Sequence, residues 1–384
     1  MAVFITALAS ALPNAPVAND DMEGVLGVAD RLPSRTRRII LRNNGIRQRY
    51  YAIDPATGVT THTNAQLTAA AIRSLLAAAG LHPAQLDSLC CGTSSPDLLM
   101  PGHGLMVHGE LGGGPCEVVT TAGICGSGMT ALKYAYMNVA LGLSQHAVAT
   151  GSELASTFLR GSFCGSPPVE RAEALERQPS LAFEADFLRW MLSDGAGAVL
   201  LRPAPAPAGL SLRVEWIEHR AFAHGLDTCM YAGGVPQEGV LRGWREFATP
   251  SAAAAAGAFL IKQDTKLLNR EIISTAVQRT LPGLIEKYSL AAESIDWYLP
   301  HYSSEYFRGP LHQNMAAIGF DIPQERWFTN LQTKGNTGAA SIYIMLDELF
   351  HSGRLRDGQR LLCMIPESGR FSMCYMMLTV VAQG

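Results

Sequence analysis

The feature that most constrains the fold is an internal duplication, because residues 65–155 and 265–370 follow the same order of elements. In the first copy, an expected helix over Thr68–Ala79 leads to an apolar strand-like run. In the second copy, an expected helix over Ile272–Tyr288 does the same. Strands that alternate with helices are typical of parallel βαβ units. The sequence therefore predicts an α/β fold of two duplicated, βαβ-rich halves, layered about a pseudo-twofold axis.

The correspondence between the two copies continues further along the chain. The run Cys125-Gly126-Ser127-Gly128 and its helix correspond to residues 335–341 and the helix that follows them. Each helix is followed by a buried-strand pattern, at residues 147–150 and 360–365. A proline-rich connector over Arg202–Pro207 marks the boundary. We therefore expect an N-terminal half at residues 1–205 and a C-terminal half at residues 206–384.

Cys125 is the strongest candidate for a chemical role. The β-branched run Glu117–Ala122 predicts a strand before it, and Met129–Leu141 predicts a helix after it. A thiol on a tight glycine turn at a helix N-terminus is typical of an activated nucleophile, because the free N–H groups there favour the thiolate. The alternative is a buried structural cysteine. Flanking glycines argue for the nucleophile.

Two residues of the second half are expected beside Cys125. His301 ends a predicted strand, and Asn336 stands in the turn that corresponds to the Cys125 turn. Ligand sites in such folds gather at the carboxyl ends of strands, where all three residues are placed. A histidine at a strand end can instead cap a turn, and an asparagine between Gly335 and Thr337 can be a turn residue that tolerates left-handed φ. Both alternatives stay open at this point.

Composition excludes several classes of partner. The chain has 384 residues, 48% of them hydrophobic, and a formal charge of -3 with no long basic run, which argues against nucleic acid. Its eight cysteines show no zinc-ligand spacing, so we expect no metal and a reduced, cytoplasmic protein. The N-terminus lacks a basic segment of the signal-peptide type. The longest apolar run, over residues 252–261, is too short to cross a bilayer, so no membrane insertion is expected.

Taken together and in this order, the motifs resemble those of the thiolase-like condensing enzymes, most closely the ketoacyl-acyl-carrier-protein (ACP) synthase III family. The resemblance covers nearly the whole chain. It rests on these runs: Asn44-Gly45-Ile46-Arg47-Gln48-Arg49, Gly92 to Asp97, Ala122 to Gly128, Asp194 to Val199, Pro300-His301 and Gly335-Asn336-Thr337. It implies a thiolase fold with α-β-α-β-α layers and a homodimer.

The resemblance also implies a catalytic triad of Cys125, His301 and Asn336. Cys125 would take an acyl group from a thioester. His301 and Asn336 would donate hydrogen bonds to the carbonyl of a second, malonyl or β-ketoacyl, thioester and stabilise its enolate. The enolate would then attack the acyl group on Cys125 in a Claisen condensation. The expected substrates are acyl-coenzyme A or acyl-ACP thioesters, and no further cofactor is expected.

Two loops depart from the family pattern. His301 is followed by Tyr302-Ser303-Ser304-Glu305, where the family has Gln-Ala-Asn, and the late glycine-rich loop is replaced by residues 366–371. Gly369 is a candidate for an N–H of the oxyanion hole. Glu367 is either an additional acid or base, or one half of an ion pair with Arg370 that only shapes the loop.

Two further segments carry open alternatives. Arg35, Arg37 and Arg38 precede the first resembling motif, where coenzyme A users of the family often have a tryptophan. They either bind the phosphate of phosphopantetheine or the acidic face of an acyl carrier protein, or form a solvated basic face. The segment 157–190 is longer than the family leads us to expect and rich in aromatic residues. It either walls an acyl pocket or serves a dimer contact or ordinary packing.

The altered loops favour a specialised ketosynthase of polyketide or fatty-acid-derived biosynthesis over one that starts fatty acids. They resemble the branch that joins two acyl thioesters and closes a dialkylcyclohexanedione or dialkylresorcinol ring, a cyclisation that needs only a pocket that folds the polyketone. Two alternatives remain. One is acyl transfer from Cys125 to a hydroxyl or amine, with His301 as base. The other is a non-catalytic acyl-binding subunit of a heterodimer.

Overall fold

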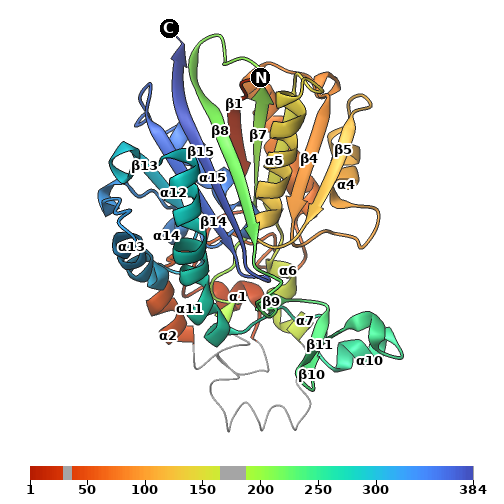
Figure 1. Ribbon diagram of the computed structural model, residues 1–384. Coiled ribbons are helices and arrows are strands. Elements are labelled where there is room, and N and C mark those ends of the chain that lie inside the picture. Colours follow the sequence, from red (N-terminus) through yellow and green to blue (C-terminus); the bar gives the residue numbers. More distant parts are fainter. Residues whose placement is uncertain (29–36, 165–186, 384) are drawn as a thin grey trace.

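A computed structural model describes residues 1–28, 37–164 and 187–383 of the chain (Figure 1). In this part of the chain, nine strands pair side by side in the order β13-β14-β15-β8-β1-β7-β6-β4-β5. Their bounds are Phe4–Ala11 (β1), Ser88–Thr93 (β4), Glu117–Ala122 (β5), Ala147–Glu153 (β6), Gly195–Arg202 (β7), Gly209–Ala221 (β8), Trp297–Pro300 (β13), Arg360–Glu367 (β14) and Ser372–Gln383 (β15).

The duplication is visible in this strand order. β4 pairs in parallel with β6, and β6, β7 and β1 pair antiparallel. β13, β14, β15 and β8 repeat the same sequence of directions. In the first half β5 adds a further parallel strand to β4, whereas in the second half one isolated bridge, Tyr298 to Trp327, stands in that place. The two groups meet where Phe4 and Ile5 of β1 pair with β8. Residues 203–208 connect them along the chain, and the division at residue 205 stays a prediction.

The expectation of parallel βαβ units is confirmed for the strands of the two duplicated segments. In the described residues β4 pairs in parallel with β5 and β6, and β13 with β14, beside two isolated parallel bridges. The remaining strands, β7, β1, β8 and β15, pair antiparallel with their neighbours.

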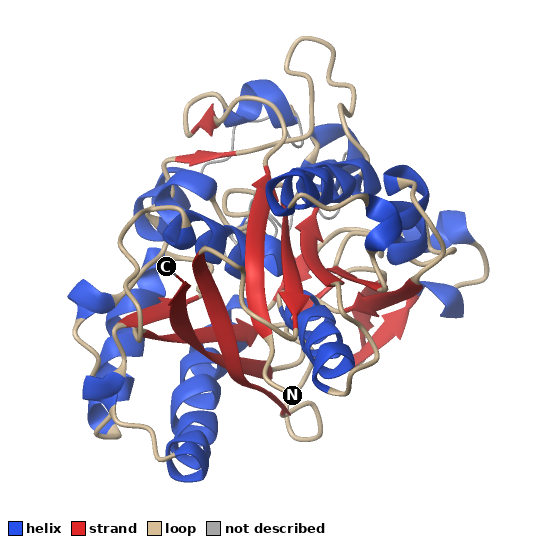
Figure 2. Ribbon diagram, turned by 90° about the horizontal axis from the view of Figure 1, so that it is seen from above, coloured by secondary structure: helices blue, strands red, loops and turns tan. Residues whose placement is uncertain are grey.

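The helices complete five layers (Figure 2). α3 (Asn64–Ala79) and α4 (His103–Leu111) cover one outer face. α5 (Gly126–Ala140) and α15 (Ser341–Phe350) lie between the two groups of strands. α11 (Thr265–Ile273), a π-helical segment over Ser274–Thr280 and α12 (Leu281–Tyr288) lie on the other outer face with α13 (Arg308–Ala317). The α-β-α-β-α thiolase arrangement is confirmed.

Three apolar cores separate these layers. β14 shows the division well: Leu361, Cys363 and Ile365 face the middle core with α5 and α15, whereas Leu362 and Met364 face the outer core with α11 and α12. A strand buried on both faces must be apolar at every position, so its sequence reads as a continuous apolar run. This is why the strands were recognisable without alternation.

The helix bounds differ slightly from those expected. α3 begins at Asn64, four residues before the predicted start, because Thr63 and Gln66 form a capping box at its N-terminus. α5 begins at Gly126 directly after Cys125 and ends at Ala140. The predicted helix over Ile272–Tyr288 is the second part of a continuous helical stretch that begins at Thr265 with Asp264 as its N-cap.

Smaller elements gather at the end of the strands where β4, β5, β6, β13 and β14 finish (Figure 1). They are α1 (Met22–Leu26), α2 (Arg37–Asn44), α6 (Ser156–Leu159), α7 (Gly161–Cys164), α10 (Pro250–Ala255), α14 (Leu331–Lys334), and the short strands β2 (Val17–Ala18), β3 (Gln48–Arg49), β9 (Met230–Tyr231), β10 (Gly234–Gln237), β11 (Val240–Gly243) and β12 (Lys262–Gln263). In the described part of the chain, no helix has the length and apolar character that a bilayer span requires.

Candidate active site

Cys125 lies at the junction between β5 and α5, as the sequence predicts. Gly123 and Ile124 make the turn after β5, and Cys125 itself is the N-cap residue of α5. The hydroxyl and backbone N–H of Ser127 both bond the carbonyl of Ile124, at 2.7 and 3.1 Å, and close the turn. Cys125 is 9% exposed. The thiol is thus held in one place at the edge of a cavity.

His301 directly follows β13 and is buried. Its backbone N–H donates to the carbonyl of Met364 at 2.8 Å, which continues the pairing of β13 with β14. Burial lowers the pKa of its imidazole to about 4. Because the neutral ring carries one N–H and one bare nitrogen, His301 can both donate and accept a hydrogen bond at neutral pH.

Asn336 is fixed by its backbone and by one end of its side chain. Its N–H donates to Met191 and its carbonyl accepts from Ser193, at 3.0 and 2.8 Å. The side-chain Oδ1 accepts from the N–H of Gly338 at 3.0 Å. With Oδ1 engaged in this way, the Nδ2 group is the donor that remains for a ligand.

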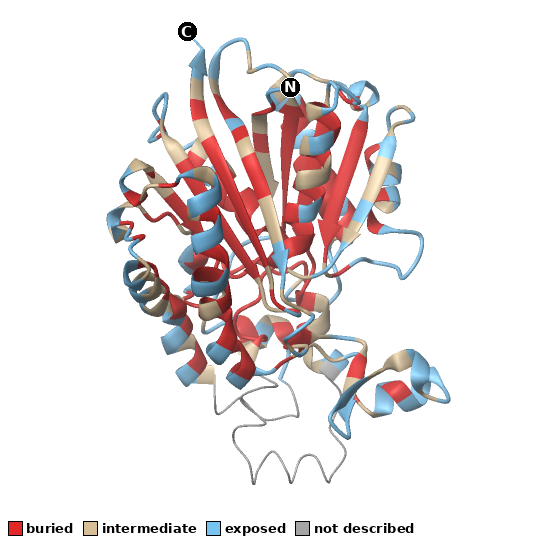
Figure 3. Ribbon diagram, viewed as in Figure 1, coloured by how far each residue is buried: buried red, intermediate tan, exposed pale blue. Residues whose placement is uncertain are grey.

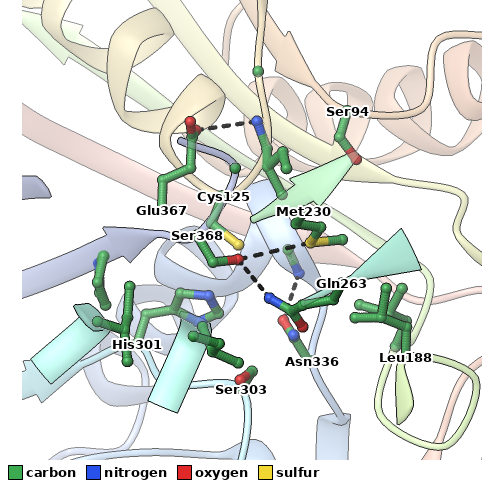
Figure 4. A pocket seen from close by; sticks show the side chains of 18 of the residues that line it. Ser94, Cys125, Leu188, Met230, Gln263, His301, Ser303, Asn336, Glu367 and Ser368 are labelled. Carbon is green, nitrogen blue, oxygen red and sulfur yellow. Dashed lines mark hydrogen bonds between the residues drawn. The ribbon is translucent and has the colours of Figure 1, made fainter. Parts of the chain in front are cut away.

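Figure 4 shows that the side chains of Cys125, His301 and Asn336 come from three different elements and meet at one cavity. Its volume is about 390 Å³. Most of the wall is apolar and includes Phe158, Leu188, Leu192, Met230, Ile261, Leu268, Ile272, Phe307 and Leu311. An apolar cavity with a few polar groups at one point suits a ligand with a hydrocarbon chain and a single reactive carbonyl.

The charge state of Cys125 differs from the expectation. Burial raises the pKa of the thiol well above its usual value, and the neighbouring carboxylates of Glu367 and Glu153 raise it further. The N-terminus of α5 does not outweigh these effects. These effects favour the thiol form of Cys125, and the prediction of a ready thiolate is wrong.

Glu367 and Gly369 both line the cavity next to Cys125. Oε2 of Glu367 accepts hydrogen bonds from the N–H groups of Ile124 and Gly126, at 3.0 and 2.9 Å. The alternative ion pair with Arg370 does not form, since Arg370 donates instead to the carbonyl of Leu226 at 3.1 Å. Gly369 packs against Ile124, and its role in an oxyanion hole stays a prediction.

Sequence reasoning did not select Glu153 as a site residue. It is buried at the end of β6 and lines the same cavity. Its carboxylate accepts from the hydroxyls of Ser94 and Ser95 at 2.6 and 2.9 Å, and from the N–H of Ala339 at 3.1 Å. Burial raises its pKa to about 7. The duplication could have identified Glu153, because Glu153 ends a strand of the first copy and Glu367 ends the corresponding strand of the second copy.

The three arginines do not form one group that the structure can describe. Arg35 lies outside the described residues. Arg37 pairs with Glu23 at 2.7 Å and lies over the ring of Trp190, so it joins α2 to α1. Arg38 is exposed on α2. A carrier-binding role for these residues stays a prediction.

The segment 157–190 is described only at its two ends, since residues 165–186 lie outside the described part. Phe158 and Leu188 line the cavity, whereas Trp190 is buried in the core beside Arg37 and Arg189. The described ends thus serve both of the expected purposes, a pocket wall and ordinary packing.

Comparison with known sequences supports the resemblance. Residues 285–369 match the family model described as the C-terminal region of 3-oxoacyl-[acyl-carrier-protein] synthase III. The chain is 26% identical over 368 residues to a β-ketoacyl-[acyl-carrier-protein] synthase III of Streptomyces coelicolor, with 94% of this chain and 92% of that protein covered. It is 27% identical over 356 residues to a synthase III of Rhizorhabdus wittichii, with 92% and 91% covered.

Solved structures share the fold over almost the full length. A tetronic acid condensing enzyme, AbyA1, superposes with a TM-score of 0.77 at 22% identity, covering 98% of this chain and 99% of that one. OleA of Xanthomonas campestris, solved with bound lauric acid and lauroyl-CoA, gives 0.75 at 20% identity, with 99% of each chain covered. The chain therefore shares its architecture with these structures.

Proposed function

We infer that this chain, a relative of the ketoacyl-ACP synthase III condensing enzymes, is a ketosynthase that loads an acyl group on Cys125 and extends it by Claisen condensation. The observation that carries the inference is the meeting of Cys125, His301 and Asn336 at one apolar cavity. A nucleophile and two neutral hydrogen-bond donors that line one such cavity match the needs of a thioester condensation.

In the loading step, the sulfur of Cys125 attacks the carbonyl of an acyl thioester. The thioester carbon–sulfur bond to the carrier breaks, and the thiol proton of Cys125 ends on the departing carrier thiol. Backbone N–H groups beside Cys125, with Gly369 as the candidate partner, hold the oxyanion during the exchange. The hydrocarbon chain then lies against the apolar wall.

In the condensing step, His301 and the Nδ2 group of Asn336 donate to the carbonyl of the second thioester. These bonds stabilise the enolate that forms when a malonyl group loses carbon dioxide or a β-ketoacyl group gives an α-proton to a carboxylate of the cavity wall, which returns it to the sulfur of Cys125 after condensation. The enolate carbon attacks the acyl carbonyl, the new carbon–carbon bond forms, and the bond to Cys125 breaks. No further cofactor is needed for either step.

The finer assignment concerns substrates and product. The relatives are named for acyl-carrier-protein substrates, so we propose that a carrier protein delivers at least one thioester. We further propose a role in polyketide or fatty-acid-derived biosynthesis in which a β-ketoacyl partner gives a product that closes to a dialkylcyclohexanedione or resorcinol-type ring. The loops at 302–305 and 366–371 support this branch.

The test combines intact-protein mass spectrometry with analysis of the small-molecule products. Wild type and Cys125→Ala are incubated with a panel of acyl thioesters, and then with malonyl or β-ketoacyl thioesters. We expect an acyl adduct that requires Cys125 and that disappears when the second thioester yields a longer or cyclic product. A purely linear product overturns the ring closure alone. Absence of any adduct overturns the ketosynthase assignment in favour of a partner subunit.

Asn336→Ala separates condensation from simple acyl transfer. The variant keeps Cys125 and its turn, so loading should continue, whereas condensation should slow by about 100-fold or more because one donor to the enolate is lost. The comparison is made in single-turnover reactions that start from acyl-Cys125. A variant that transfers the acyl group to hydroxyl or amine acceptors at the wild-type rate, with no condensation in wild type either, would favour the acyltransferase.

A further inference from the structure

Two glutamates occupy equivalent places in the duplicated halves. Glu153 is the last residue of β6 and Glu367 the last residue of β14. β6 and β14 are equivalent strands, because β6 pairs in parallel with β4 and antiparallel with β7, and β14 pairs in parallel with β13 and antiparallel with β15. The two carboxylates thus lie at corresponding strand ends and line the same cavity.

Glu367 of the C-terminal half binds the Cys125 turn, residues 123–126, of the N-terminal half. Both of its hydrogen bonds come from backbone N–H groups that flank Cys125, on Ile124 and Gly126. A Cβ atom on Gly126 would lie 2.7 Å from Oε2 of Glu367. Gly126 is therefore the residue that lets the carboxylate approach, and the glycine and the glutamate fit as a pair.

Glu153 of the N-terminal half likewise binds the Asn336 turn, residues 336–339, of the C-terminal half. Its Oε1 accepts from the N–H of Ala339, three residues after Asn336. A Cβ on Gly338 would lie 2.7 Å from Cγ of Glu153. Gly338 in turn donates to the side chain of Asn336. Each half therefore holds the catalytic turn of the other through a carboxylate and a glycine.

We propose that Glu367 and Glu153 form a reciprocal brace that positions the Cys125 and Asn336 turns, and that the charge of Glu367 controls when Cys125 becomes nucleophilic. Both are positioning residues. The proposal rests on Cys125 being the nucleophile of the proposed function. Glu367 is the informative member of the pair, because its hydrogen bonds reach the turn on both sides of the reacting residue.

Among the described residues, few positive charges lie around the thiol on which the charge of Glu367 acts. The ionisable groups near Cys125 come from β6, β14, β15, the residue after β13 and the 368–371 turn: Glu153, Glu367, Cys374, His301 and Arg370. His301 is neutral above about pH 4, and Arg370 is exposed and directed to Leu226. Negative charge therefore dominates, and it disfavours the thiolate. An incoming thioester that covers or neutralises Glu367 would release this restraint.

Glu367→Gln keeps an acceptor for both N–H groups and removes only the charge. The experiment measures the rate at which iodoacetamide alkylates Cys125, followed by peptide mass mapping between pH 6 and 10, and needs no substrate. We expect the rate profile of Glu367→Gln to move to lower pH by about one unit, as removal of a close like charge predicts. Glu286→Gln, which removes an exposed charge on α12, is the matched control and should follow wild type. Coincident profiles for Glu367→Gln and wild type would overturn the role of the charge.

Glu367→Ala tests the brace itself. It leaves the N–H groups of Ile124 and Gly126 without their partner, so acyl loading from a thioester should slow at every pH, and Glu367→Gln should restore it. Thermal melting of both variants separates a loosened turn from a lost fold. Loading by a folded Glu367→Ala at the wild-type rate would overturn the brace. Because alkylation is independent of condensation, a failed ketosynthase assay with a shifted alkylation profile would count against the proposed function alone.

Discussion

Glu153 is a buried carboxyl whose ionisation falls in the working range of most enzymes. Burial raises its pKa to about 7, against 4.5 for an ordinary glutamate, although hydrogen bonds from Ser94, Ser95 and Ala339 oppose the shift. A folded-state pKa above the unfolded value means that the folded protein holds a proton that the unfolded chain has lost. Stability must therefore fall as pH rises from about 4.5 to 7.

Glu153→Gln should remove this part of the pH dependence. We expect the free energy of unfolding of wild type to drop by about 3 kcal/mol between pH 4.5 and 7.5 through this one group, and the variant to lose that component of the slope. Urea denaturation at a series of pH values measures it. Glu286→Gln should retain the wild-type slope, since Glu286 is exposed. Parallel slopes for Glu153→Gln and wild type would show that Glu153 titrates normally.

At the scale of residues, a site residue could be predicted from the sequence where it follows the end of a predicted strand. Cys125 and His301 follow predicted strands, Asn336 stands in the turn that corresponds to the Cys125 turn, and the structure brings all three to a single cavity. Their catalytic roles stay predictions. The charge state of Cys125 could not be read from its own motif, because the carboxylate that acts on it comes from β14, more than 240 residues later in the chain. Local spacing carries no information about such a contact.

α5 and the turn at 338–340 approach so closely that no side chain fits between them. A Cβ on Gly128 would collide with the backbone oxygen of Ala339 and lie 3.1 Å from the ring of Tyr343. The hydroxyl of Tyr343 also donates to the carbonyl of Gly128 at 2.8 Å. The two helices of the middle layer, and with them Cys125 and Asn336, are set at their distance by this contact.

Gly128→Ala should push these elements apart. We expect a loss of about 1–3 kcal/mol in the free energy of unfolding, because the colliding atom is backbone and cannot rotate away. Gly283→Ala is the matched control: Gly283 lies in α12 with nothing near its Cβ position, so alanine should stabilise the protein by about 0.5–1 kcal/mol. The midpoints of urea denaturation of the two variants and wild type measure these changes in stability. A Gly128→Ala protein as stable as Gly283→Ala would disprove the close approach.

At the scale of elements, the sequence predicted which segments form strands and helices better than how they pair. Strands such as β14 and β7 are apolar apart from charged residues at their ends, and such a run does not reveal its direction or its neighbours. β14 and β15 pair antiparallel because the short turn at residues 368–371 connects them as a hairpin. The sequence predicted a loop there but not the hairpin. The missing counterpart of β5, reduced to the bridge of Tyr298 with Trp327, had no signal of its own.

In the part of the chain that the structure describes, β5 lies at one end of the strand order and leaves its outer edge unpaired. β5 pairs with β4 on one side only, and its residues are exposed or half-buried along its length, as the pale strand at the edge of Figure 3 shows. Near it, the loop between β4 and α4 exposes Leu99 and Met100, each by 78%. An open strand edge beside exposed apolar side chains is unfavourable in water. We propose that a second copy of the chain covers this edge, in agreement with the homodimer that the family resemblance implies.

Leu99→Asp tests this interface without disturbing the monomer, because a side chain that is 78% exposed contributes little to its own core. A charge buried between two copies lacks a partner, so the dissociation constant should rise by about tenfold or more. Size-exclusion chromatography with light scattering, over a range of concentrations, measures the change. Val59→Asp, at a residue that is 62% exposed in a different loop, should leave association as in wild type. A wild-type protein that stays monomeric at high concentration would show that no second copy covers the edge, and that the open edge of β5 is stable in water. A Leu99→Asp variant that associates as tightly as Val59→Asp would show that the interface lies elsewhere.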